Sequence, residues 1–227
     1  MKKLTEIIVK YSKKYINENN DWYNWRVINE DKLPMGIELP KGNQYLKNVI
    51  LKKELNKKWK ESQSDEDKLI LIKYYIATWG GIHTNSSESM EEYSKLSASQ
   101  LIKNGKKGIA SWSKAIVVHD PNEYAIFDAR VAISLNCIQK LYGLNDAVLF
   151  PVLPSRNKIV ALGNKLIKAT AKSESWEKAY EENFYTQYLK ILNYVAKELN
   201  SDISTIEMLL FAKAEELVQD AYPNSLN

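Results

Sequence analysis

The chain of 227 residues is predicted to fold into a mainly α-helical protein. Only eight glycines and six prolines interrupt it, and its apolar residues recur mostly at spacings of three and four, which is the helical pattern. With 44% hydrophobic and 26% charged residues, the composition is that of a globular protein rather than a disordered one. Because nothing in this pattern requires two cores, residues 1–227 are predicted to form a single unit.

The N-terminal segment is predicted to be an amphipathic helix. Its apolar face carries Leu4, Ile7, Ile8, Tyr11 and Tyr15. Charges interrupt this segment throughout, so it lacks the apolar stretch of a signal peptide or membrane span. Residues 17–43 follow as a loop, because they hold two prolines, two glycines and many asparagines. Three aromatic residues in this loop either pack on the core, which is the more common role, or stack on a substrate: Trp22, Tyr23 and Trp25.

Two helices are predicted between residues 44 and 79. The first, at about 44 to 61, is expected to bury Leu46, Val49, Ile50 and Trp59. The second follows Ser64, which forms a helix cap with Asp67, and it is the most apolar helix of the chain. The paired glycines Gly80 and Gly81 end this helix and allow the backbone to pass close to another segment.

The remaining helices are predicted from caps, turns and apolar spacing. A short helix at SASQLIK, the turn NGKKG and the helix IASWSKAIVV are followed by a helix from Asp128 to about residue 142. Residues 143–157 are irregular, and three helices follow at about 158 to 171, 175 to 199 and 204 to 219. Ser204 and Glu207 are predicted to form a capping box for the last one. The helix at 175 to 199 is expected to bury Trp176, Tyr180, Ile191, Leu192 and Val195.

Charge and cysteine content narrow the classes of function. The net charge of +4 and a pI near 8.8 are compatible with binding a polyanion without being diagnostic of it. A single cysteine, Cys137, excludes an internal disulfide, a zinc site of several thiolates and an iron–sulfur cluster, and it indicates a reducing, cytoplasmic location. Neither His83 nor His119 has partners at metal-ligand spacing, so we expect no metal site and no cofactor.

Two features of the segment 103–136 have both an ordinary and a functional interpretation. Gly105 and Gly108 bracket two lysines before a helix, so free backbone N–H groups and positive side chains suit a phosphate there. The ordinary alternative is a helix cap followed by solvated lysines. Asp128 follows an apolar run and precedes a helix, where its carboxylate is either a common N-cap or a functional group at a positive helix end.

Together, these features resemble the helix-hairpin-helix DNA glycosylase superfamily, and most closely bacterial proteins with the 8-oxoguanine DNA glycosylase fold. The likeness is carried by residues 105–109 (GKKGI), 111–115 (SWSKA) and 127–131 (FDARV), and more weakly by 79–82 and 206–211. The turn here is Gly-x-x-Gly, where the superfamily usually has Gly-x-Gly. The resemblance implies a hairpin at about 97–119 and an active cleft between two helical halves.

The resemblance also implies that the partner is DNA, double-stranded with a flipped base, and that the protein excises a modified or damaged base in DNA repair or phage defence. The hairpin would hold the DNA backbone through Gly105, Lys106, Lys107, Gly108 and Ile109. Trp79 and Trp112 are candidates for stacking on the flipped base. Arg130 would contact a phosphate, or it pairs with a carboxylate of the core, which is the more common role. Residues 154–157 form either a substrate loop or a polar turn.

Two residues are predicted to be catalytic. Asp128 would assist cleavage of the N-glycosidic bond by stabilising an oxocarbenium ion or preparing an attacking group. Bifunctional superfamily members carry a lysine nucleophile two residues after the second hairpin glycine, but here that position is Ala110. Lys114 lies one turn further on the same helical face, about 6 Å along the axis. It is therefore either a Schiff-base nucleophile, which would add lyase activity, or a solvated lysine.

Two other classes of function stay open from the sequence. The chain is alternatively a catalytically inactive DNA-binding module of the same fold, for which Ala110 is the main argument. It is otherwise a helical protein-interaction domain in bacterial defence or stress, in which the hairpin is only a turn.

Overall fold

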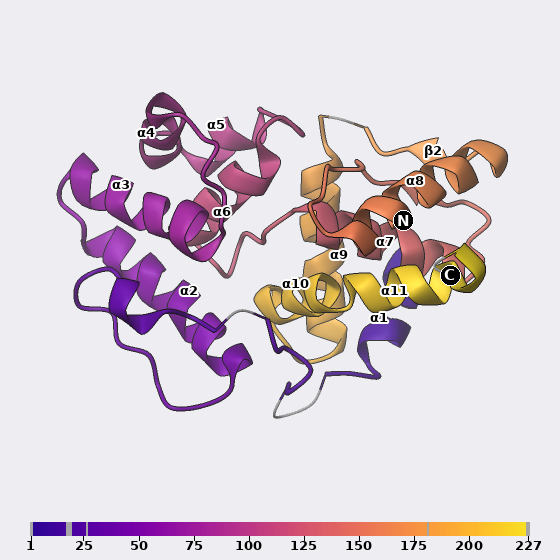
Figure 1. Ribbon diagram of the computed structural model, residues 1–227, viewed down its shortest axis with the longest axis horizontal. Coiled ribbons are helices and arrows are strands. Elements are labelled where there is room, and N and C mark those ends of the chain that lie inside the picture. Colours follow the sequence, from indigo (N-terminus) through magenta and orange to yellow (C-terminus); the bar gives the residue numbers. More distant parts are fainter. Residues whose placement is uncertain (1, 17–19, 26, 181, 226–227) are drawn as a thin grey trace. The chain divides into compact units, whose positions relative to one another are not determined.

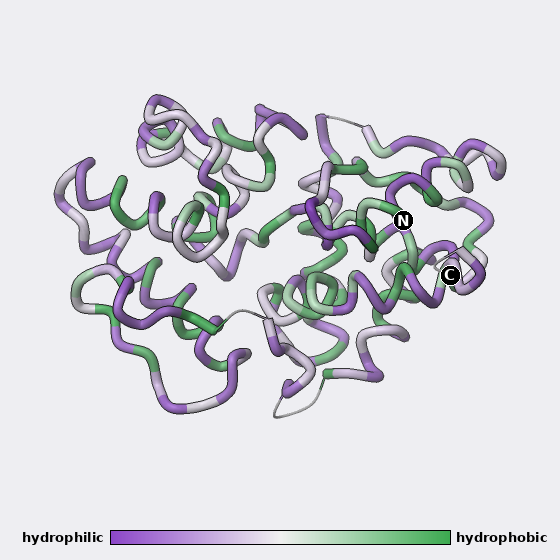
Figure 2. The backbone as a smooth tube through the Cα atoms, in the orientation of Figure 1, coloured by the Kyte–Doolittle hydropathy of each residue, from purple (hydrophilic) through white to green (hydrophobic). Residues whose placement is uncertain are grey.

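The computed structural model describes residues 2–16, 20–25, 27–180 and 182–225, and it confirms a mainly helical protein (Figure 1). Within these ranges the chain forms eleven α-helices and two strands of two residues each. It divides into two compact units: one comprises Met1–Trp22 with Phe127–Asn227, and the other comprises Tyr23–Ile126. We call them the terminal unit and the central unit. In both, hydrophobic residues alternate with hydrophilic ones along the helices, as amphipathic packing requires (Figure 2).

The central unit is built around α6 (Ile109–His119), whose residues 111–118 are all buried. Helices α2, α3, α4 and α5 and the π-helix η2 all pack against α6. The elements of this unit are η1 (Glu30–Lys32), α2 (Gln44–Glu61), α3 (Asp65–Lys73), η2 (Tyr74–Trp79), α4 (Ser87–Lys95), α5 (Ala98–Ile102) and α6. Tyr23 is buried in this unit and Trp25 is half-buried, while Trp22 of the terminal unit is also half-buried.

The predicted bounds of α2 are confirmed, but its predicted buried face is wrong. The helix does not bury Leu46, Val49, Ile50 and Trp59; it buries Asn48, Leu51, Lys52, Leu55 and Asn56. The reason is that two asparagines on this face find buried hydrogen-bond partners. Asn48 Oδ1 accepts a hydrogen bond from Trp79 Nε1, and Asn56 Nδ2 donates to the carbonyls of Val118 and His119 at the end of α6.

The terminal unit is built around α7 (Ala129–Leu141), which is buried from Arg130 to Gln139. Helices α1, α8, α10 and α11 pack against it. The elements are α1 (Lys2–Ser12), α7, β1 (Val148–Leu149), α8 (Lys158–Ser173), β2 (Glu177–Lys178), α9 (Phe184–Glu198), α10 (Ile203–Ala212), α11 (Ala214–Ala221) and η3 (Pro223–Ser225). As predicted, α1 is amphipathic and buries Leu4, Ile8 and Tyr11.

Two helix starts in the terminal unit differ from the prediction. The helix expected from residue 175 begins at Phe184, because Ser175 has a left-handed φ of 55° and the next residues form β2, which pairs in parallel with β1. Trp176 is therefore half-buried and Tyr180 is 74% exposed, whereas Ile191, Leu192 and Val195 are buried as predicted. The last predicted helix is two helices, α10 and α11. Asp202 caps the first by accepting from the Thr205 amide, while Ser204 and Glu207 lie buried inside it.

None of the helices in the described part of the chain has the length and apolarity needed to cross a membrane.

Candidate functional site

The segment predicted to form the hairpin consists of α5, a turn at 103–108 and α6 in the central unit, and we keep the name hairpin for it. Ser97 and Gln100 form a capping box at the start of α5, and Gly108 is the N-cap residue of α6. Gly105 and Gly108 have φ values of 56° and 66°, in the left-handed region that glycine tolerates best. A Cβ on Gly108 would also lie 2.8 Å from the hydroxyl of Tyr93. The turn therefore favours glycine at both positions, and at Gly108 the Tyr93 hydroxyl leaves no room for a side chain.

Trp112 holds this turn against α6. Its side chain is fully buried, and its Nε1–H donates to the carbonyl oxygens of Gly105 at 3.2 Å and Lys107 at 3.1 Å. The indole ring thus has no exposed face on which a base could stack in this conformation. Its position gives Trp112 a structural role in the hairpin, and the predicted stacking on a base would need the ring to leave the turn.

The start of α6 carries free backbone donors next to positive side chains. The amides of Ser111 and Trp112 both donate to the Gly108 carbonyl. Within the described residues, the amides of Gly108 and Ala110 donate no hydrogen bond. Lys103, Lys106 and Lys107 are exposed around the turn, and the first turn of α6 holds no acidic residue. Since the positive end of the helix dipole lies here, the local field favours an anion.

Lys114 is buried in the central unit, so the alternative of a solvated lysine is wrong. Its side chain is 4% exposed, and Nζ donates to the carbonyl oxygen of Ala110 at 2.7 Å. The lysine passes directly over Gly80, because a Cβ on Gly80 would lie 2.9 Å from Lys114 Cε and 2.5 Å from the Ile76 carbonyl oxygen. This close contact confirms that Gly80 lets the backbone approach another segment.

Trp79, the other predicted base-stacking residue, is half-buried at the end of η2. Its Nε1–H donates to Asn48 Oδ1 at 2.9 Å, and its ring stacks on Tyr75 with centroids 4.4 Å apart. The ring also borders a pocket of about 260 Å³ whose lining includes Asn29 and His83. Unlike Trp112, Trp79 therefore faces a cavity that could admit a ligand.

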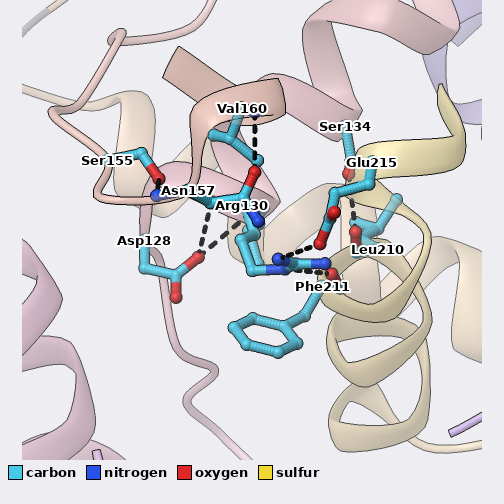
Figure 3. A network of polar contacts seen from close by, with 10 residues as sticks. Asp128, Arg130, Ser134, Ser155, Asn157, Val160, Leu210, Phe211 and Glu215 are labelled. Carbon is cyan, nitrogen blue, oxygen red and sulfur yellow. Dashed lines mark hydrogen bonds and ion pairs between the residues drawn. The ribbon is translucent and has the colours of Figure 1, made fainter. Parts of the chain in front are cut away.

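Asp128 is the N-cap of α7 in the terminal unit (Figure 3). Its Oδ1 accepts hydrogen bonds from the amides of Arg130 at 2.9 Å and Val131 at 3.1 Å. Within the described residues, Oδ2 accepts no hydrogen bond. The preceding residue, Phe127, is fully buried and makes edge contacts with Phe184 and Tyr188. The backbone next to the carboxylate is therefore anchored in the core.

The charge of Asp128 acts on a buried neighbour. The pKa of Tyr188 is raised well above its ordinary value, first by burial of the phenol and then by the nearby charges of Glu207 and Asp128. Tyr188 is therefore a neutral hydrogen-bonding group at physiological pH. Since Tyr188 carries no charge, it adds nothing to the negative potential at Asp128.

Arg130 pairs with a carboxylate, which is one of its two predicted roles. Its Nη1 donates to Glu215 Oε1 at 2.8 Å, its Nε donates to the Phe211 carbonyl at 2.9 Å, and its guanidinium lies 5.0 Å from the centroid of the Phe211 ring (Figure 3). The arginine is only 7% exposed. The hydrogen bond from Arg130 lowers the pKa of Glu215 below its ordinary value. The guanidinium therefore joins α7 to α10 and α11 instead of facing solvent.

Sequence reasoning missed several residues of these sites. Glu215 lies 85 residues from Arg130 in the chain, and no local pattern pairs them. The π-helical form of η2 also escaped prediction, because the segment reads as a continuation of an apolar helix. Within the described residues, no three His, Cys, Asp or Glu side chains gather where they could hold a metal ion. The hairpin, Lys114 and Trp79 belong to the central unit, and Asp128 and Arg130 to the terminal unit.

No protein-family model matches the chain, and searches of curated proteins and of solved structures find no match either.

Proposed function

We propose that the chain is a DNA glycosylase-like protein that cleaves the N-glycosidic bond of a modified or damaged base. The observation that carries the proposal is the hairpin turn at 103–108. Its two left-handed glycines leave the amides of Gly108 and Ala110 without acceptors, among exposed lysines and at the positive end of α6. Backbone amides and lysines in this arrangement are the donors that position a protein on DNA phosphates.

Asp128 and Lys114 supply the chemistry of the proposal. The Asp128 carboxylate keeps one oxygen available after capping α7, and a carboxylate near C1′ stabilises the positive charge that develops as the base leaves. A neutral Lys114 amine would attack C1′, forming the C–N bond to Nζ as the bond to the base breaks. The amine proton would pass to the departing base, and the product is a Schiff base once the sugar ring opens.

The first experiment measures glycosidic cleavage of duplex oligonucleotides that carry a panel of damaged and modified bases. Asp128→Asn should lower the rate by about 100-fold or more, the scale seen when one electrostatic stabiliser is removed. Asparagine is as good an N-cap as aspartate, so the fold should persist. Asp202→Asn makes the same chemical change at the cap of α10 and should leave the rate unchanged. Full activity in Asp128→Asn would refute the mechanism.

The second experiment tests the lyase step. Borohydride should trap a covalent complex of protein and DNA, and Lys114→Ala should abolish the trapping. Cleavage without trapping in the unsubstituted protein would make the enzyme a simple hydrolase. Trapping that survives in Lys114→Ala would assign the nucleophile to a different amine.

The third experiment tests the DNA interface. Lys106→Glu with Lys107→Glu should weaken DNA binding at least tenfold and reduce the salt dependence, because about two phosphate contacts are lost. The matched control is Lys57→Glu with Lys60→Glu, which makes the same change of charge at exposed positions on α2 of the same unit. Equal affinities in the two double variants would mean that the hairpin does not bind DNA.

A second candidate function is a DNA-binding module of the same fold without catalysis. It is favoured by the environment of Lys114, whose amine is buried and already donates to the Ala110 carbonyl. Salt-dependent DNA binding with no cleavage of any substrate in the panel would select this candidate.

A further inference from the structure

A second cavity of the central unit, larger than the pocket beside Trp79, lies beside the π-helix η2. It has a volume of about 680 Å³, within the 300–1,000 Å³ typical of small-molecule sites. It shares Lys32, Tyr74, Thr78 and His83 with the smaller pocket beside Trp79. Single-turn π-helical segments within helices occur frequently at functional sites, and here η2 supplies both Tyr74 and Thr78 to the lining.

Tyr74 carries a hydroxyl that makes no hydrogen bond to a described residue and is open to solvent. The residue is 6% exposed and lines both cavities, yet within the described residues its hydroxyl makes no hydrogen bond. Burial raises the pKa of Tyr74 to about 12, so the phenol stays protonated and can donate. The hydroxyl is open to the cavity rather than enclosed in the core, so it can donate a hydrogen bond to an acceptor atom of a ligand there.

The larger cavity is lined by basic side chains. Lys32, Lys73 and His83 are exposed at its wall. Among the described lining residues there is no aspartate or glutamate, and the neighbouring carboxylates Asp31 and Glu88 do not line it. The cavity therefore favours an anion, and the free Tyr74 hydroxyl lies among the groups that would hold it.

An apolar wall completes the cavity. Met35 is 98% exposed and Ile70 is 51% exposed, and both line it together with Leu33, Pro34 and Met90. Exposed methionine and isoleucine side chains next to cationic groups suit a ligand that joins a flat, weakly polar body to an anionic group. A nucleotide has this composition, because its base packs on apolar surface and its phosphate takes hydrogen bonds and positive charge.

We propose that this cavity binds a nucleoside monophosphate unit, with the phosphate held by the Tyr74 hydroxyl, Lys32 and Lys73 and the base against Met35 and Ile70. Two sources supply this chemistry: a free nucleotide and a nucleotide within a single strand of DNA. The proposal does not depend on glycosylase activity, since all of these residues belong to the central unit and none is Asp128 or Lys114.

The test is calorimetric titration of the full-length protein with adenosine and guanosine 5′-monophosphates, adenosine and inorganic phosphate. We expect saturable binding of at least one monophosphate, with adenosine and phosphate at least about tenfold weaker. Tyr74→Phe should weaken binding about tenfold, because it removes one hydrogen bond to a charged group and keeps the ring. Lys73→Gln should weaken it similarly from an exposed position, whereas Lys57→Gln on α2 should not change it.

A competition experiment distinguishes a free nucleotide from a nucleotide within a DNA strand: a short single-stranded oligonucleotide displaces bound monophosphate. The protein used carries Lys106→Glu and Lys107→Glu, so that DNA binding by the hairpin does not contribute. Displacement by a lower concentration of oligonucleotide than of free nucleotide would assign the cavity to a DNA strand, and the reverse would assign it to a free nucleotide. The proposal is overturned if neither probe binds saturably, or if Tyr74→Phe and Lys73→Gln both bind as the unsubstituted protein does. Asp128→Asn should bind normally, which separates this outcome from a failure of the glycosylase proposal.

Discussion

The role of Trp112 in shaping the hairpin can be tested by replacing it with phenylalanine. The substitution keeps an aromatic ring in the fully buried site but removes the Nε1–H that donates hydrogen bonds to the carbonyl oxygens of Gly105 and Lys107. Losing the donor for these carbonyls costs about 1–3 kcal/mol. The smaller ring adds about 1 kcal/mol for the gap that it leaves in a packed core. We therefore expect the free energy of unfolding to fall by roughly 2–4 kcal/mol.

Urea unfolding followed by circular dichroism measures this change, and the melting temperature should fall by roughly 5–15 °C. The control is Trp176→Phe, because Trp176 is half-buried and its Nε1–H donates to the exposed carboxylate of Glu174. That control should change the free energy of unfolding by less than about 0.5 kcal/mol. A loss below about 1 kcal/mol in Trp112→Phe would show that the indole does not hold the turn.

Three further predictions concern groups away from the hairpin. The pKa of His119 is lowered to about 4, chiefly by burial, so as the pH falls the unfolded chain takes up a proton on this imidazole before the folded protein does. The free energy of unfolding should therefore fall by up to about 1.4 kcal/mol per pH unit as the pH drops from about 6.5 toward 4. Urea unfolding at a series of pH values measures this loss, which His119→Gln should not show. Glu215→Gln should destabilise the protein by about 1–3 kcal/mol, because it leaves Arg130 buried without its carboxylate. Because the pKa of Glu215 is lowered in the folded protein, the stability difference between Glu215→Gln and the unsubstituted protein should be complete above about pH 4.3 and disappear in more acidic solution. A stability difference that persists in acid would contradict the pairing of Arg130 with Glu215. Gly163→Ala should cost about 1–3 kcal/mol, because its Cβ would lie 2.5 Å from Val218 Cγ2, and adding Val218→Ala should recover most of the loss in a double-mutant cycle.

Local signals in the sequence predicted most helix starts correctly, because a cap depends on residues three or four positions apart. Ser64 caps α3 as predicted, and Asp128 caps α7. The same logic failed at residue 204, where Ser204 and Glu207 match a capping box but Asp202 lies two residues earlier and takes the role. A cap motif therefore identifies that a helix begins, while competing polar residues nearby decide where.

Tertiary contacts could not be predicted in the same way. The buried face of α2 was misjudged because Asn48 and Asn56 are buried through partners 31 and 62 residues away, which the apolar pattern does not reveal. Helix α4 was not predicted. It buries only Met90, Tyr93 and Ser94, and it packs against α3 and α6, which come from other parts of the sequence. The cavity beside Tyr74 likewise depends on three separate segments, so composition alone gave no sign of it.

The position of the Lys114 amine relative to Ala110 follows from helix geometry. Side chains on a helix lean toward its N-terminus, and one helical turn rises about 5.4 Å, close to the length of a lysine side chain. Lys114 follows this geometry: its Nζ reaches back one turn and lies 2.7 Å from the carbonyl oxygen of Ala110. The amine is therefore delivered beside the residue that stands where the glycosylase resemblance expects a nucleophilic lysine. A lysine at position 110 would lean toward the N-terminus in the same way, so the Lys114 amine lies about one turn, roughly 5.4 Å, from where the amine of such a lysine would be. Lys114→Ala in the trapping experiment tests whether the proposed chemistry tolerates this offset.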